Sequence, residues 1–199
     1  EISPVALIPR QETELLVDLA LQKFDNDFRG LWADLGTGSG ALAVALARSL
    51  PGAIGHAVDC SDDALSLAKR NLKRLAPAAE VSLHLGSWWQ PLRPWWGTIS
   101  LVLANPPYIP AAVLDDLDPI IRENEPSLAL CGGPDGLNAC REIVNGAFYA
   151  MSKEGWLFLE HHHDQSDAVL DMMNKVGLKD VDFENDLQGI KRFALGRHP

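Results

Sequence analysis

Two short turns carry the residues whose types and spacing suit chemistry. The first is the glycine-rich run Asp34-Leu35-Gly36-Thr37-Gly38-Ser39-Gly40, and the second is Asn105-Pro106-Pro107-Tyr108. Alternating glycines let a backbone approach a ligand without Cβ atoms in the way, and a helix that starts after them offers free N–H groups. A carboxamide followed by two prolines places hydrogen-bond acceptors on a rigid backbone. Together, the two turns predict a ligand pocket beside a site that holds a polar group.

The glycine turn has the surroundings of a cofactor-binding turn. Apolar residues 31–35 precede it and predict a buried strand, and residues 41–50 are rich in helix formers. Asp59 ends the next apolar run, where a carboxylate can accept hydrogen bonds from ribose hydroxyls. Taken alone, a glycine turn and an acid also fit a nicotinamide dehydrogenase. The spacing GxGxG, in place of GxGxxG, resembles the motif of class I methyltransferases, which use S-adenosylmethionine.

Tryptophans follow the third predicted strand at 81–85. Trp88 stands where its ring can lie against adenine, and packing in the core fits this residue nearly as well. Trp89, Trp95 and Trp96 are expected to cover the sheet. Trp88 is therefore the tryptophan that we expect to contact a cofactor.

The Asn-Pro-Pro-Tyr turn suits the methylation of a planar amide or amine nitrogen. Because the lone pair of such a nitrogen is delocalised, its attack on a methyl donor depends on orientation more than on a strong base. The side-chain carbonyl of Asn105 and the backbone carbonyl of Pro106 can accept the two N–H bonds of the substrate. Pro107 stiffens the backbone, and Tyr108 offers a flat surface for packing. Such positioning can account for roughly 7–11 kcal/mol of a barrier, so neither a metal nor a covalent nucleophile is predicted.

From this turn we predict Asn105, Pro106 and Tyr108 as catalytic residues. The substrate-binding residues are predicted to be Asn105, Pro106, Pro107 and Tyr108.

The elements that must position both turns alternate between strands and helices. The predicted strands are 31–35, 54–58, 81–85, 99–104, 156–160, 181–183 and 193–195. The predicted helices are 12–24, 41–50, a segment that starts at Ser61 or Asp62, 138–151 and 166–176. The alternation predicts an α/β fold with a Rossmann-like, mainly parallel, doubly wound sheet. In such sheets ligands bind at the carboxyl ends of the strands, and both turns fall there. At 199 residues, we expect one domain spanning 1–199.

Composition limits the partners and the compartment. The formal net charge of −10 argues against direct nucleic-acid binding, which draws its affinity from Lys and Arg. No apolar stretch approaches the roughly 18 residues of a membrane span. Cys60, Cys131 and Cys140 are widely spaced and form no CxxC pair, which is typical of a reducing, cytoplasmic setting.

The order of the motifs resembles the catalytic domain of the release-factor glutamine methyltransferases, the PrmC/HemK family. The resemblance covers nearly the whole chain. It is carried by Ile8-Pro9-Arg10-Gln11-Glu12-Thr13-Glu14, the glycine turn, Asn105 to Ile109, Glu125-Pro126 with Ala129-Leu130, and Gly132-Gly133-Pro134-Asp135-Gly136-Leu137. The combination of these segments is far more selective than the Asn-Pro-Pro-Tyr turn, which many amino-methyltransferases share.

The resemblance implies the class I methyltransferase fold, S-adenosylmethionine as cofactor, and a cytoplasmic protein, which we expect to be a monomer. It implies that the substrate is the glutamine of the Gly-Gly-Gln motif in class 1 peptide-chain release factors, methylated on its side-chain amide nitrogen. A small helical N-terminal domain, typical of the family, is not part of residues 1–199. The residues implied to bind the cofactor are Gly36, Thr37, Gly38, Ser39, Gly40, Asp59, Trp88 and Asn105.

Three positions depart from the family pattern. Gln11 replaces a proline of the opening motif, and Ser87 stands where the family often has an acid that contacts adenine. Residues 160–165 differ from the usual Glu-x-Gly segment and contain the run His161-His162-His163. Since consecutive residues cannot easily all face one ion, we expect a solvated loop there in place of a metal site.

Two other functions fit parts of the pattern. The exocyclic amine of adenine or guanine in RNA or DNA presents the same two N–H bonds to Asn105, and such a base would have to be flipped into the pocket. A non-catalytic module that binds S-adenosylmethionine would need the glycine turn but not the rigid acceptors after residue 104.

Overall fold

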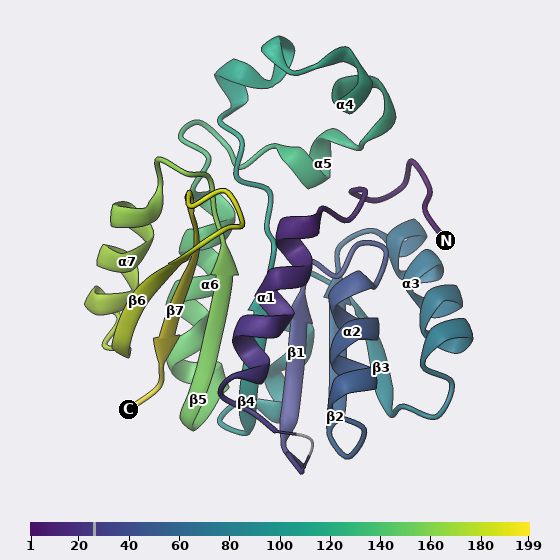
Figure 1. Ribbon diagram of the computed structural model, residues 1–199, viewed down its shortest axis with the longest axis vertical. Helices are drawn as coiled ribbons and strands as arrows, with labels where there is room; N and C mark the ends of the chain where they lie inside the picture. The colour runs from purple at the N-terminus through teal and green to yellow at the C-terminus, as the bar shows by residue number, and fades with distance from the viewer. Residues whose placement is uncertain (26) are drawn as a thin grey trace.

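A seven-stranded sheet forms the centre of the computed structural model (Figure 1). The structure describes residues 1–25 and 27–199, apart from the side chain of Gln11. Asn26, in the polar stretch expected to end the first helix, lies outside the described residues. The strands are β1 (Leu31–Leu35), β2 (Ile54–Asp59), β3 (Val81–Leu85), β4 (Ile99–Ala104), β5 (Met151–Glu160), β6 (Lys179–Asn185) and β7 (Lys191–Arg197).

The order of the strands is β3-β2-β1-β4-β5-β7-β6. Strands β1 to β5 pair in parallel, and β7 runs antiparallel to both of its neighbours. The chain winds outward from β1 to β3 and then returns to the other side of β1 with β4. This confirms the predicted mainly parallel, doubly wound sheet, with a reversal point between β1 and β4 where ligands bind.

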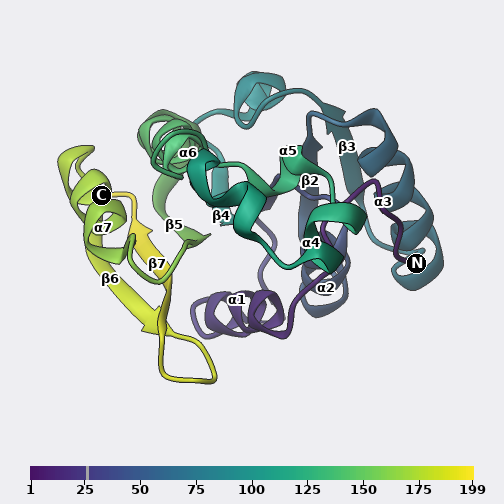
Figure 2. The same ribbon diagram turned by 90° about the horizontal axis from the view of Figure 1, so that it is seen from above.

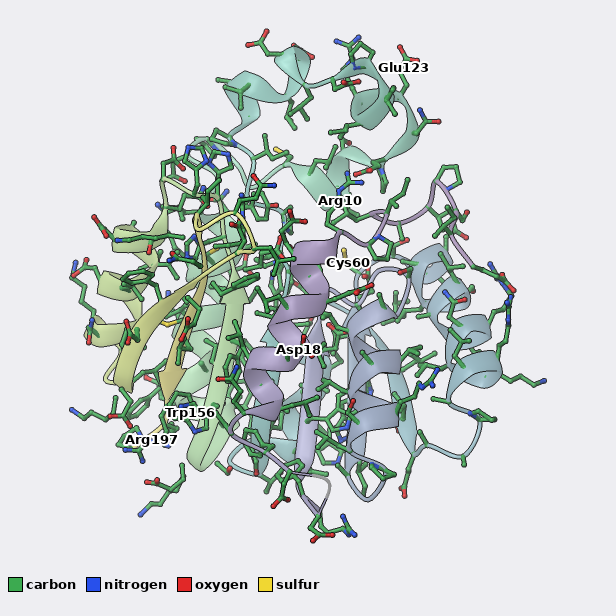
Figure 3. The ribbon with its side chains drawn as sticks, in the orientation of Figure 1. Arg10, Asp18, Cys60, Glu123, Trp156 and Arg197 are labelled. Carbon is green, nitrogen blue, oxygen red and sulfur yellow. The ribbon has the colours of Figure 1, made fainter. Side chains whose placement is uncertain are left out.

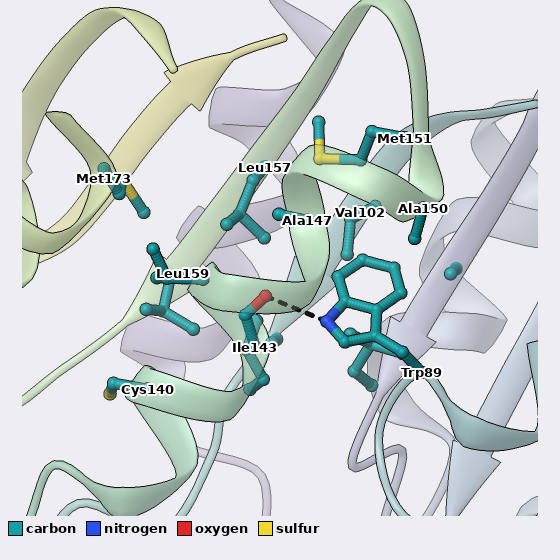
Figure 4. Packing of buried hydrophobic residues seen from close by; sticks show 14 of the residues in the cluster. Trp89, Val102, Cys140, Ile143, Ala147, Ala150, Met151, Leu157, Leu159 and Met173 are labelled. Carbon is teal, nitrogen blue, oxygen red and sulfur yellow. Dashed lines mark hydrogen bonds between the residues drawn. The ribbon is translucent and has the colours of Figure 1, made fainter. Parts of the chain in front are cut away.

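Helices cover both faces of the sheet (Figure 2). On one face, α1 (Gln11–Leu21) and α2 (Ala41–Ser49) pack over an apolar cluster that contains Trp32 and Phe158. On the other face, α6 (Asn138–Ala150) and α7 (Ser166–Lys175) pack over a second cluster. Trp89, expected to cover the sheet, lies in this second core, where its indole N–H donates to the carbonyl of Ile143 at 2.8 Å (Figure 4).

Helix α3 (Asp62–Leu75) shows why the sequence forms a helix beside β2. The hydroxyl of Ser61 caps the helix by accepting from the Ala64 N–H at 3.2 Å. Two aspartates occupy the first turn, and Lys73 and Arg74 the last, which complements the helix dipole. The predicted cap and helix are confirmed.

The main departure lies between β4 and α6, where short helices were not predicted. They are the 3₁₀ helix η2 (Ala111–Asp116), α4 (Pro119–Asn124) and α5 (Ser127–Leu130). Another 3₁₀ helix, η1 (Gln90–Trp95), lies outside this region and follows β3. In Figure 1, α4 and α5 stand above the carboxyl ends of the strands. Strand β5 also begins at Met151, five residues before the predicted start at Trp156. No helix within the described residues is long and apolar enough to cross a membrane.

Candidate active site

A cavity of about 460 Å³ lies at the carboxyl ends of the central strands. The glycine turn after β1, the end of β2, the segment after β3 and the turn after β4 form its floor and walls. The rest of its lining includes Pro126, Leu128 and Ala129 around α5 and, near the N-terminus, Val5, Ala6, Leu7 and Pro9. Of the residues predicted for the site, those that line the cavity are Gly36, Thr37, Gly38, Ser39, Asp59, Trp88, Asn105 and Pro107. The structure therefore brings most of the predicted site together.

The glycine turn depends on backbone conformations that favour glycine. Gly36 has φ +78° and Gly40, the residue before α2, has φ +81°. A Cβ on Gly36 would stand 3.1 Å from the ring of Trp88, and one on Gly40 would stand 3.0 Å from the Cα of Ala68. The turn is thus packed closely on both sides, against the ring of Trp88 and against α3.

Asp34, in β1, forms hydrogen bonds that hold the glycine turn in place. One oxygen of its fully buried carboxyl accepts from the hydroxyl of Thr37 at 2.6 Å and from the N–H of Ala43 at 3.1 Å. Burial, reinforced by the nearby charge of Asp59, raises the pKa of Asp34 to about 7. The carboxyl therefore connects the turn to the first turn of α2.

Asp59 faces the same turn from the end of β2. Its Oδ2 accepts from the N–H of Gly38 at 2.8 Å, and its Oδ1 accepts from the N–H of Ser61 at 2.9 Å. Each carboxylate oxygen keeps a further lone pair, and Asp59 lines the cavity. The geometry leaves this acid able to accept from the hydroxyls of a bound sugar.

Trp88 forms another wall of the cavity, while its neighbour Trp89 points into the core. Trp88 has φ +44°, an uncommon conformation for a residue with a side chain. Its ring lies over the backbone of Gly36. Ser87 lines the cavity beside it. At this position the chain therefore has a short hydroxyl side chain where the family often has an acid.

Asn105 follows β4 and presents its carboxamide at the cavity. Its Nδ2 donates to the hydroxyl of Thr13 in α1 at 3.0 Å. Its Oδ1 is buried and has no hydrogen-bond partner among the described residues. A buried acceptor without a partner is costly unless a donor is supplied from outside the described residues, so Oδ1 is free to accept a hydrogen bond.

Glu160, at the end of β5, lies behind this amide and was not among the predicted site residues. The sheet register pairs Ala104 with Leu159, which brings the next residue of each strand, Asn105 and Glu160, to the same edge. Glu160 is 2% exposed and accepts from the hydroxyls of Thr13 at 3.1 Å and Tyr108 at 3.3 Å. Burial raises the pKa of Glu160 to about 7.

Three of the predicted site residues are not among the described residues that line the cavity: Gly40, Pro106 and Tyr108. Pro106 is buried, and the ring of Tyr108 lies beside that of His162, with centroids 6.1 Å apart. The hydroxyl of Tyr108 is directed at Glu160, and burial together with this carboxyl raises its pKa. Tyr108 thus contacts Glu160, which also accepts from Thr13, and its hydrogen-bond link to Asn105 runs through these two residues.

The histidine run is only partly the solvated loop that we expected. His161 is fully buried, and its Nδ1 lies 2.8 Å from the carbonyl of His162, whereas His163 is exposed. The expectation is wrong for His161 because the loop turns inward directly after β5, beside Arg192 of β7. Within the part of the chain that the structure describes, no cluster of three or more His, Cys, Asp or Glu side chains could hold a metal ion.

An ion pair fastens the upper wall of the cavity to the start of α1. Arg10, labelled at the top of α1 in Figure 3, donates to Glu125 at 2.5 Å, and the Glu125 side chain is 2% exposed. Pro126, Leu128 and Ala129, which follow Glu125, line the cavity. The contact therefore ties the residues after Glu125 that line the cavity to the start of α1.

The fold, the glycine turn with its strand-terminal acid and the Asn-Pro-Pro-Tyr turn together define a class I methyltransferase. The family described as Methyltransferase small domain matches residues 11–128. The catalytic domain of hMettl16, in complex with MAT2A 3′UTR hairpin 1, superimposes with a TM-score of 0.77 over 100% of this chain and 73% of that chain, at 14% identity. At this identity the likeness shows the fold alone.

Relatives of known name narrow the class. The release factor glutamine methyltransferase of Prochlorococcus marinus is 56% identical over 201 residues, which cover 100% of this chain and 69% of that protein. The release factor glutamine methyltransferase of Thermosynechococcus vestitus is 42% identical over 200 residues, with the same coverage. The chain belongs to the family of release factor glutamine methyltransferases. It is therefore an enzyme that uses S-adenosylmethionine as methyl donor, as the sequence predicts.

Proposed function

We propose that this chain methylates the side-chain amide nitrogen of the glutamine in the Gly-Gly-Gln motif of class 1 peptide-chain release factors. The observation that carries the proposal is the Asn105 carboxamide, whose nitrogen is bound to Thr13 and whose oxygen lacks a partner. An acceptor without a donor is the complement of a primary amide, which brings two N–H bonds and no strong nucleophile. The membership of the family supplies the identity of that amide.

The residues around the cavity fit S-adenosylmethionine. The volume of about 460 Å³ lies within the usual range of cofactor sites. Asp59 would accept from the ribose, Trp88 would lie against the adenine, and the turn from Gly36 to Gly40 would hold the amino-acid part. When bound, S-adenosylmethionine supplies a methyl group on a positively charged sulfur.

The chain's own contribution is orientation. Asn105 would accept one N–H of the glutamine through Oδ1, and the carbonyl of Pro106 would accept the other. Pro107, which lines the cavity, has a fixed φ and keeps these acceptors in place. Tyr108 would support the turn through its hydrogen bond to Glu160. The gain comes from holding the nitrogen in near-attack geometry rather than from base catalysis.

The proposal includes a protein partner and a cytoplasmic location. A net charge of −10 favours a protein substrate over direct binding of nucleic acid. Transfer of radiolabelled methyl to release factor, tRNA, rRNA and DNA, each offered separately, tests this choice. We expect label in release factor alone. Label in a nucleic acid with none in release factor would contradict the proposal.

Substitution of Asn105 tests the site itself. Asn105→Ala should lower kcat far more than it lowers cofactor affinity, because the oriented amide is needed mainly when the nitrogen attacks. Asn174→Ala is the matched control, since Asn174 is an exposed asparagine of α7. Near-normal turnover of release factor by the Asn105 variant would refute the proposed role.

A further inference from the structure

The Asn105 amide is the first member of a chain of hydrogen bonds that runs through Thr13, which also lines the cavity, to Glu160, which does not. Asn105 Nδ2 donates to Thr13 Oγ1 at 3.0 Å, and the Thr13 hydroxyl donates to Glu160 Oε2 at 3.1 Å. The three residues come from the turn after β4, from α1 and from the end of β5. Thr13 and Glu160 are 7% and 2% exposed, so water cannot readily replace either contact.

The direction of these bonds determines which way the Asn105 carboxamide is turned. A hydroxyl has a single proton, and a carboxylate can only accept. When the Thr13 hydroxyl donates its hydrogen bond to Glu160, its oxygen can only accept from Asn105. The carboxamide must then turn Nδ2 toward Thr13, which leaves Oδ1 on the other side, where it has no partner among the described residues.

We propose that Glu160 and Thr13 are positioning residues that hold the Asn105 carboxamide with its oxygen toward the substrate. The inference rests on the proposed function, because it matters only if the substrate brings N–H donors. A flipped amide would present Nδ2–H to those donors, and no hydrogen bond would form. The pair thus selects between two amide orientations that are nearly equal in shape.

The charged and titratable groups around Glu160 connect this selection to pH. Arg192 of β7 favours the ionised form of Glu160, and Glu12 of α1 opposes it. Tyr108 faces the other oxygen, and Arg192 is itself paired with Asp186 at 3.3 Å. Burial leaves the pKa of Glu160 at about 7. A protonated Glu160 can donate to Thr13, which frees the Thr13 proton for Asn105 Oδ1 and allows the flipped amide.

Substitutions at Thr13 separate the hydroxyl from its bulk. Thr13→Val keeps the shape and removes the acceptor for Asn105 Nδ2, while Thr13→Ser keeps the hydroxyl. With a short Gly-Gly-Gln peptide and with intact release factor as substrates, Thr13→Val should lower kcat on the order of 10- to 100-fold. Thr13→Ser should restore most of the activity, and calorimetry should give both variants a cofactor Kd near that of the wild type.

Glu160→Gln tests the role of the carboxylate. A glutamine carries both a donor and an acceptor, as the protonated acid does, so it no longer enforces one direction. The kcat of the wild type should rise with pH through about 7, and that of Glu160→Gln should stay low and flat across the same range.

The outcomes distinguish this inference from the proposed function. Wild-type kcat in Thr13→Val, or an unchanged pH step in Glu160→Gln, would overturn the positioning roles while the proposed function stands. If Thr13→Val loses cofactor binding, the pH profile of Glu160→Gln decides the question. A wild-type protein that transfers no methyl to peptide or release factor would instead overturn the proposed function.

Discussion

The carboxylate of Asp59 accepts a hydrogen bond from the backbone N–H of Gly38 at 2.8 Å, which joins the end of β2 to the glycine turn after β1. Its second oxygen holds the N–H of Ser61, the residue that caps α3. The acid predicted to bind ribose therefore also fixes the backbone around the site. Substitution of Asp59 should therefore affect both cofactor binding and the backbone around the site.

Asp59→Ala should weaken binding of S-adenosylmethionine by roughly 1–3 kcal/mol, the range for hydrogen bonds to charged groups. Asp59→Asn keeps one carbonyl acceptor and should lose less. Calorimetric titration of the two variants measures the difference. Unchanged affinity in Asp59→Ala would remove this residue from the cofactor site.

Gly40→Ala should destabilise the protein more than Gly97→Ala does. Both glycines have φ near +80°, so each alanine costs roughly 1–2 kcal/mol in backbone strain. A Cβ at Gly40 also stands 3.0 Å from Ala68, whereas a Cβ at Gly97 meets no atom within 4 Å. Urea unfolding of both variants gives the comparison. Equal losses would show that α3 moves aside freely.

Glu125→Gln should speed release of the cofactor about fivefold, because it weakens the contact with Arg10 that fastens the α5 segment over the cavity. Glu123→Gln is the control, since Glu123 is an exposed residue of α4 that points outward in Figure 3. Stopped-flow measurement of cofactor dissociation compares the two. Similar rates in both variants would show that the ion pair does not hold the cavity closed.

His56 should make the folded protein sensitive to mild acid. Burial and the adjacent His84 ring lower the pKa of His56 from 6.5 to about 4. Because the unfolded chain then binds a proton that the folded chain does not, the free energy of unfolding falls as the pH drops below about 6.5. The pKa of Asp34 and of Glu160 is raised, so these two acids cost stability as the pH rises and change it in the opposite direction.

Comparison of His56→Leu with the wild type isolates the contribution of His56. The wild type should lose about 2 kcal/mol more than the variant between about pH 7 and pH 5, measured by urea unfolding. The exposed His163→Leu should behave like the wild type. Parallel curves for His56→Leu and the wild type would contradict the assignment.

Most of the fold could be predicted because its signals are local. Each central strand is an apolar run bounded by turn residues, and the cap at Ser61 lies within three residues of its partner. The glycine turn and Asp59 follow their strands directly, so the parallel sheet brings them to one edge. The helices in residues 111–130 were missed because each is shorter than the window over which helical periodicity can be recognised.

The residues behind Asn105 could not be predicted from spacing. Thr13 lies 92 positions from Asn105 and 147 from Glu160, and the contacts exist only because α1 packs across the ends of β4 and β5. The burial of His161 is likewise decided by how the loop after β5 turns toward β7. The available signal was the Glu-Thr-Glu segment at 12–14, which the resemblance singled out without giving it a role.

The most direct test of the central claim is to locate the transferred methyl group. Release factor incubated with the enzyme and S-adenosylmethionine would be digested and sequenced by tandem mass spectrometry. We predict one added methyl group, on the side-chain nitrogen of the glutamine in the Gly-Gly-Gln peptide, and its loss when Asn105→Ala replaces the wild type. A methyl group on any other residue, or an unmodified Gly-Gly-Gln peptide with active enzyme, would contradict it.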